Sequence, residues 1–320
     1  MKRHRLAAGC LALALCGVSQ ALIAASGYAT RDLNPMLQPI YLPSLVLVSA
    51  ENGWRVDHSF FITNTFQKMD RGNESLIIDV ENYRYELDFS HRRNNWLTQV
   101  SIPLLANRGG ELDSLIEGWH DFFGMPNASR DKFPQDELNI EYLRDGVVEY
   151  SQTGSSSGVG DIALAVGYQP AGKTAYFAGI ELPTGSASDF TGNEAIDVAF
   201  WLSRELPVNA NMNAYGMLGI SFPGDDGQLQ GLVRDHVWVA QLGLDYRFRD
   251  DYVATAQLDL HTSVIEDSDL KAFGESVQLQ LGLGFLNLLE DHRLDLFFSE
   301  DILVGSAPDI SFGLRLAREF

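Results

Sequence analysis

The sequence has little cysteine and, beyond its first 25 residues, no long apolar run. No later segment reaches the roughly 18 consecutive apolar residues of a membrane-spanning helix, which excludes a helical membrane protein. Both cysteines, Cys10 and Cys16, lie within those first 25 residues. A chain cut after them carries no thiol, which excludes disulfides and cysteine catalysis and suits passage through an oxidising compartment.

Positive charge is also scarce. The chain has 23 Lys and Arg against 43 Asp and Glu, and its net charge is −20. Three of the basic residues precede residue 26, so the remainder has a net charge near −23. Such a surface repels phosphate backbones, and nucleic acid is therefore not an expected partner.

Motifs for chemistry are missing as well. There is no Gly-x-Ser-x-Gly elbow and no His/Cys/carboxylate set with metal-ligand spacing, so we predict no catalytic residue, metal or cofactor. His236, beside Asp235 and near Asp225 and Asp226, fits a solvated acidic loop better than an Asp–His general base. These aspartates and the acidic run at 266–269 alternatively suit divalent cations at a lipopolysaccharide surface. The serines at 155–157 predict a flexible loop.

The N-terminus has the three parts of a secretory signal peptide. A basic stretch at 2–5 precedes an apolar run at 6–18, and small residues follow at 19–25. The run is shorter than the roughly 20 residues of a spanning helix. We therefore predict a cleaved signal peptide over residues 1–25 and a mature domain over 26–320.

Strict alternation of apolar and polar residues dominates the mature chain. Apolar side chains occupy every second position over 83–89, 238–248, 252–260 and 277–285, and Gln, Gly, Asp, Arg or Ser fill most positions between them. Period two predicts strands, and their length of 9–12 residues exceeds the usual five or six of soluble proteins. Strands of about 9–11 residues cross a bilayer at a tilt, and in lipid they must close into a ring. The sequence therefore predicts an all-β, transmembrane antiparallel barrel of about 14 strands, within a range of 12–16.

Connections between the predicted strands differ in length. Short turns are expected at 93–95, 170–172, 207–209, 249–251 and 290–292, and longer polar loops at 184–192, 223–233 and 266–273. Short periplasmic turns and long extracellular loops are typical of outer-membrane barrels.

One region, at about 107–137, departs from the alternation. Its apolar residues between 112 and 123 recur at helical spacing, which predicts a helix-bearing insertion. Glu117, His120 and Arg130 form a candidate polar cluster tying the insertion to the barrel. Alternatively, the glutamate and histidine lie on a helix surface without a shared role.

The last strand ends in an aromatic residue. Phe320, Leu316, Leu314 and Phe312 alternate along it, although Arg318 interrupts the apolar series. This tail resembles the signal read by the outer-membrane assembly machinery, which pairs with the strand by β-augmentation. We expect that machinery, outer-membrane lipid and lipopolysaccharide as partners.

Four stretches together resemble the domain-of-unknown-function 3187 family of outer-membrane barrels. They are RDLNPMLQPIYLP at 31–43, LIEGWHDFFGMPNASR at 115–130, GVGDIALAVGY at 158–168 and ELPTGSASDFTG at 181–192. The resemblance implies location and fold but no reaction.

The leading functional hypothesis is a passive pore or uptake channel for small solutes, with a preference for cations because of the acidic excess. Alternatives are a structural or interaction barrel with a plugged lumen, a membrane-embedded hydrolase, and a soluble periplasmic β-sandwich. The sequence favours a non-enzyme in the outer membrane.

Overall fold

A computed structural model of the chain describes residues 27–320 apart from 31, 46–51, most of 111–135, 171, 290–291, 304, 306 and 309. The strands are β1 (Gly53–Arg71), β2 (Glu74–Arg93), β3 (Trp96–Arg108), β4 (Asn139–Arg144), β5 (Val147–Gln152), β6 (Ser156–Val159), β7 (Ile162–Tyr168), β8 (Thr174–Leu182), β9 (Asp197–Asn209), β10 (Met212–Phe222), β11 (Val237–Arg249), β12 (Tyr252–His261), β13 (Ser276–Leu289), β14 (His292–Asp301) and β15 (Ile310–Glu319). Two 3₁₀ turns, η2 (Gly227–Leu229) and η3 (Lys271–Phe273), lie between them. No helix among the described residues is both long and apolar enough to span a membrane.

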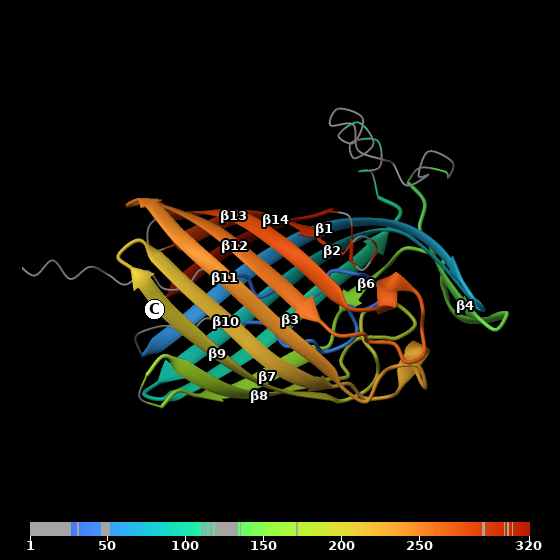
Figure 1. Cartoon of the computed structure of the whole chain (residues 1–320), viewed down its shortest axis with the longest axis horizontal. Helices are drawn as coiled ribbons and strands as arrows, with labels where there is room; N and C mark the ends of the chain where they lie inside the picture. The colour runs from blue at the N-terminus through green and yellow to red at the C-terminus, as the bar shows by residue number, and fades with distance from the viewer. Residues whose placement is uncertain are drawn as a thin grey trace, which may run out of the picture.

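Twelve of the strands form a closed antiparallel barrel. The ring runs β1–β2–β3, continues through β7 to β15 in chain order, and returns to β1. The last strand closes it, with pairs from Arg55↔Glu319 to Asn64↔Ile310. Figure 1 shows the strands tilted steeply around the barrel axis. The predicted all-β antiparallel barrel is therefore confirmed.

The barrel has 12 strands, which is the lower end of the predicted range of 12–16 and fewer than its central value of about 14, because the remaining three strands lie outside the ring. β4 pairs with Glu74–Asp79, the part of β2 that extends past the barrel, and β5 pairs with β4. Each has six residues, too few to cross a hydrocarbon layer that needs about nine. The expected loop at 155–157 is also wrong in part, because Ser156–Val159 form β6 on the end of β3.

The two ends of the barrel differ, as the sequence predicts. Short turns join β2 to β3, β7 to β8, β9 to β10 and β11 to β12, and the C-terminus lies at the same end (Figure 1). Long connections, including 183–196 and 262–275 with 14 residues each, gather at the other end. The turn predicted at 207–209 lies at 210–211 instead, because β9 continues through Asn209.

The polarity of the barrel is inverted relative to a soluble protein. Along β11, Leu242 points outward with 57% of its surface exposed, whereas its neighbour Gln241 is 3% exposed and points inward. The same division holds around the wall, where large apolar side chains face out and polar ones are buried. Soluble proteins seldom expose contiguous apolar surface on this scale, so this distribution sets the barrel apart from them.

An apolar core lies at the long-loop end. The inner faces of β2 and β4 contribute Ile78 and Tyr142, which pack with Phe273 of η3 and Phe190 of the 183–196 loop. Met36, Leu37 and Ile40 from the N-terminal segment belong to the same cluster. We call this cluster the apolar cap; it joins β2, β4 and the long loops to the N-terminal segment.

Candidate functional site in the barrel lumen

Buried charge inside the molecule is strongly acidic. Among the described residues, thirteen carboxylates but only three guanidinium groups are buried. The arginines are all paired: Arg55 with Asp57, Arg84 with Glu86 and Arg315 with Asp295. Unpaired buried charge is costly, so the wall holds its arginines by ion pairs and its surplus carboxylates by hydrogen bonds.

Residues 27–45, which we call the lumen segment, occupy the barrel interior (Figure 1). All of its described residues are buried except Ala29 and Ser44, which are half-buried. The segment starts beside Arg315 in the middle of the lumen, turns at 34–40 under the long loops, and returns towards β1. It therefore forms a narrow hairpin-like plug with two limbs.

The first limb is held by inward side chains of β12 and β15. Arg315 donates to the Gly27 carbonyl at 2.7 Å, and Gln257 both accepts from the Tyr28 amide and donates to its carbonyl. Thr30 donates to Asp259, and Asp32 contacts His261 at 2.5 Å. The backbone groups of Gly27 and Tyr28 thus find partners on the wall, as a buried segment without regular structure requires.

The turn and the second limb have their own anchors. Asn34 donates to the Ala272 carbonyl at 2.8 Å, and Gln38 donates to Asn82 at 2.7 Å. Asp197 accepts from the Tyr41 amide, and Ser221 donates to the Tyr41 carbonyl. These contacts fix the segment under the loops.

Gln241 of β11 joins the two limbs. Its amide nitrogen donates to the Thr30 carbonyl at 3.1 Å, and its amide oxygen accepts from the Leu45 amide at 2.5 Å. One side chain therefore bonds both limbs at once, and its loss would loosen them together.

Tyr28 is held against the wall by packing contacts of its ring as well as by hydrogen bonds of its backbone. Its ring stacks on Phe297 at 4.0 Å between centroids, and the guanidinium of Arg315 lies 5.3 Å from the ring centre. The hydroxyl points at Gly282, where an added Cβ would come within 1.9 Å of it. Glycine at 282 is therefore required by the close approach of Tyr28.

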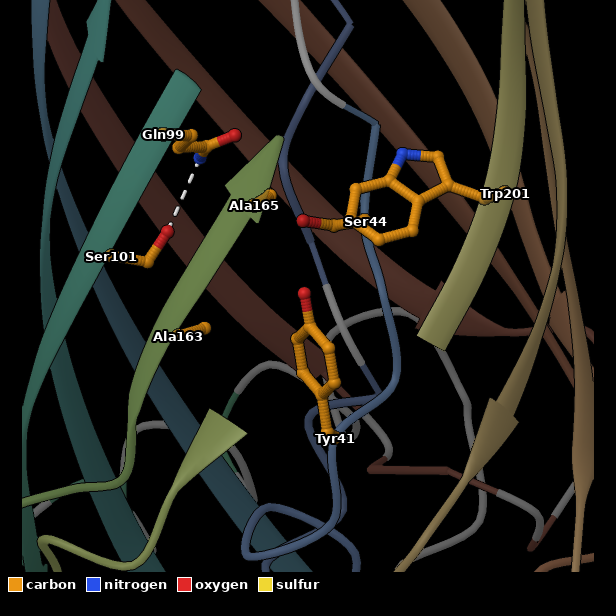
Figure 2. A pocket seen from close by; sticks show the side chains of 7 residues that line it. All are labelled: Tyr41, Ser44, Gln99, Ser101, Ala163, Ala165 and Trp201. Carbon is orange, nitrogen blue, oxygen red and sulfur yellow. Dashed lines mark hydrogen bonds between the residues drawn. The ribbon is translucent and has the colours of Figure 1, made fainter. Parts of the chain in front are cut away.

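A pocket remains between the second limb and the wall (Figure 2). Tyr41 and Ser44 of the lumen segment face side chains from β3, β7 and β9, and the pocket is lined by Tyr41, Ser44, Gln99, Ser101, Ala163, Ala165 and Trp201. Gln99 also lines a second cavity with Arg55, Asp57, Asp88 and Arg315. The lumen is thus largely filled, with small polar cavities between plug and wall.

The predicted assembly-signal residues share the outer face of β15. Phe312, Leu314 and Phe320 are exposed and Leu316 is half-buried. Phe320 exchanges backbone hydrogen bonds with Trp54 at 3.1 and 2.8 Å, so the chain end completes the β1–β15 seam. This placement suits strand pairing; recognition by the assembly machinery stays a prediction.

The candidate cluster Glu117, His120 and Arg130, and the helix predicted around it, lie outside the described residues. The start of that insertion is later than expected, because β3 continues through Arg108. His236 is exposed. Asp226 caps η2 and Asp225 accepts a hydrogen bond from the Gly231 amide, so these two aspartates stabilise the conformation of their own loop. The described part of the chain contains no group of three or more potential metal ligands.

The lumen segment was not predicted from the sequence, although residues 31–43 are one of the stretches that resemble the family. One signal was present: prolines at 35, 39 and 43 interrupt an apolar stretch that has no strand or helix period. Proline prevents regular pairing in such a stretch, while its apolar residues still require burial. A buried irregular segment ahead of the first strand follows from these two facts.

Comparison with solved structures finds barrels of similar shape. The COG4313 outer membrane channel from Pseudomonas putida F1 aligns with a TM-score of 0.56 and 13% identity, over 85% of this chain and 97% of that one. The NanC porin aligns at 0.43 and 10% over 83% and 98%, and the P. putida toluene transporter TodX at 0.43 and 12% over 85% and 91%. At 13% identity the likeness to the COG4313 channel concerns the fold alone. A search of curated proteins finds no match.

The family model described as "Protein of unknown function (DUF3187)" matches residues 19–320, which include the lumen segment and every barrel strand. The chain therefore belongs to the domain-of-unknown-function 3187 family.

Proposed function

We propose that the protein is an outer-membrane channel for small solutes, and that the lumen segment closes it in the state described. The observation that carries the proposal is the inverted barrel: an apolar wall around a polar, carboxylate-rich interior. A barrel built in this way suits a bilayer outside and an aqueous path inside.

Aromatic side chains support the placement in a membrane. Trp96 and Tyr168 lie 5.0 Å apart between ring centres near the short-turn end, and Phe200 and Phe222 lie 6.4 Å apart near the other end. All four are exposed on the outer wall. Two aromatic belts would set the barrel at the interfaces of the hydrocarbon layer.

Export and assembly complete this proposal. The signal peptide over 1–25 would direct the chain across the inner membrane, and the strand ending at Phe320 would engage the assembly machinery. In the finished protein the short turns face the periplasm, while the long loops meet lipopolysaccharide. We propose no catalytic role.

A second candidate is an interaction barrel whose lumen never opens. The extent of the plug favours it, because both limbs are anchored to the wall and the turn lies within the apolar cap. The two candidates differ in one property, whether moving the lumen segment creates a conducting path.

Single-channel recording of the full chain in planar bilayers tests the choice. Gly282→Ala places a methyl group where the Tyr28 hydroxyl lies and 2.8 Å from the Cβ of Phe297 on β14, so it should unseat the first limb and shift one contact of the wall. We expect the open fraction to rise at least about tenfold, equivalent to about 1.4 kcal/mol lost from the closed state.

Gly216→Ala is the matched control, because its added methyl group would meet only Leu242 and the Gln241 carbonyl at 3.2 and 3.3 Å. If both variants stay as silent as the wild type although they are folded, the interaction barrel replaces the channel.

A further inference from the structure

The wall half of the pocket in Figure 2 has an unusual chemical composition. Gln99↔Ala165 and Ser101↔Ala163 are cross-strand pairs of β3 and β7, and Ala165 is in turn opposite Gly179 of β8. Trp201 of β9 lies over Gly179, where an added Cβ would come within 2.9 Å of the indole. Small residues thus form the floor of a trough between an amide and a hydroxyl on one side and an indole on the other.

Two polar atoms of this trough have no hydrogen-bond partner among the described residues. They are Nε1 of Trp201, a residue only 5% exposed, and Oε1 of Gln99. The orientation of the Gln99 amide is fixed, since its nitrogen donates to Asp88 at 2.9 Å and to Ser101 at 3.2 Å. The trough therefore offers one donor and one acceptor to an occupant, and leaving such groups unpaired costs about 1–3 kcal/mol each.

The lumen segment supplies the present occupant. The Tyr41 hydroxyl lies over Gly179, where an added Cβ would come within 2.4 Å of it, and Ser44 also lines the pocket. The Tyr41 backbone is held by Asp197 and Ser221, so a substitution that removes only the ring keeps these two backbone contacts. The trough is thus occupied by a neutral ring that carries a hydroxyl group.

We propose that this trough is a binding site for a small neutral ring compound bearing a hydroxyl group, and that Tyr41 occupies it while the channel is closed. A hydroxyl both accepts and donates, which matches the indole N–H and the amide oxygen. Trp201, stacked on Phe177 at 5.2 Å, provides an aromatic surface for the ring. The acidic interior disfavours anions. The proposal rests on the channel function, because a solute must reach the lumen.

Replacement of Tyr41 tests the site without any measurement of conductance. Tyr41→Ala should leave a vacancy and lower the thermal midpoint of the full chain in detergent micelles. Adding phenol or glucose should restore the midpoint, whereas toluene, a ring without a hydroxyl, should need at least about a fivefold higher concentration, as expected for one hydrogen bond. Phenol and glucose distinguish a flat ring from a polyol.

Two further substitutions show where the solute binds. In the Tyr41→Ala chain, Trp201→Phe removes the donor and Gln99→Leu removes the acceptor, and each should abolish the preference for phenol or glucose over toluene. Trp238→Phe, on the outer wall, should leave it unchanged. If Tyr41→Ala does not fold, Tyr41→Leu opens a smaller space at the same place and carries the same expectations.

The proposal is overturned if no solute stabilises either Tyr41 variant, if toluene acts as well as phenol and glucose, or if the preference survives loss of Trp201 and Gln99. Stabilisation by a solute without conductance in Gly282→Ala would instead refute the channel and keep the site. Conductance in Gly282→Ala, with no solute stabilising either Tyr41 variant, would refute the site and keep the channel.

Discussion

At the scale of single residues, Gln241 has the most direct hold on the lumen segment. Gln241→Leu keeps the volume but removes hydrogen bonds to both limbs, each worth about 1 kcal/mol. Hydrogen exchange of the Leu45 amide should therefore accelerate about 5–30-fold. Gln278→Leu is the control, because Gln278 bonds only to Ser276 and Ser299 among the described residues. Equal exchange rates in the two variants would show that Gln241 does not hold the plug.

Glu74, on the part of β2 that extends past the barrel, gives a second test at this scale. Burial raises the pKa of its carboxyl group, but hydrogen bonds from Tyr142, the Asp269 amide and Ser268 outweigh burial and lower that pKa below 4.5. Because the folded-state pKa is depressed, its stabilising effect is complete above about pH 4.5 and is lost as the pH falls through the lowered value.

We therefore expect the Asp269 amide to lose exchange protection on acidification below pH 4.5 in the wild type. In Glu74→Gln, protection should already be reduced at neutral pH and should change little with acid. A wild-type amide that stays equally protected in acid would mean that Glu74 does not tie β2 to the 262–275 loop.

At the scale of elements, the strands were predictable and the plug was not. Alternation along 238–248 assigned Leu242 outward and Gln241 inward, and both assignments are confirmed. A period of two shows which face of a strand is apolar. It gives no position for a segment such as 27–45, whose sequence has no strand or helix period. Nor does it give strand order: Gln99 meets Ala165 because β7 pairs with β3 across more than fifty residues of chain, and the trough exists only through that pairing.

At the scale of the whole molecule, the distribution of charge makes a prediction about ions. Asp88 and Asp259 are buried and bonded to neutral side chains, including Ser101 and Gln280. Once the plug is unseated, their field should favour cations. In the Gly282→Ala background, reversal potentials under a tenfold KCl gradient should show potassium preferred over chloride. The preference for potassium should be smaller in 1 M salt, because the salt screens the carboxylates. It should also be smaller in the Asp88→Asn/Asp259→Asn double variant.

Glu300→Gln, on an exposed residue near the long-loop end, should leave the reversal potential unchanged. A chloride preference, or equal values in all variants, would show that the buried carboxylates do not face the conducting path.

The inverted barrel itself is tested most directly by spin labelling along β11. Both cysteines precede residue 26, so single cysteines placed from Val239 to Tyr246 in a chain without residues 1–25 can carry a nitroxide label in lipid vesicles. Oxygen, which concentrates in lipid, should relax labels at 240, 242, 244 and 246 strongly and those at 239, 241, 243 and 245 weakly. Oxygen access that does not alternate, or that is greatest at the Gln241 and Asp245 positions, would contradict a lipid-facing outer wall around a polar lumen.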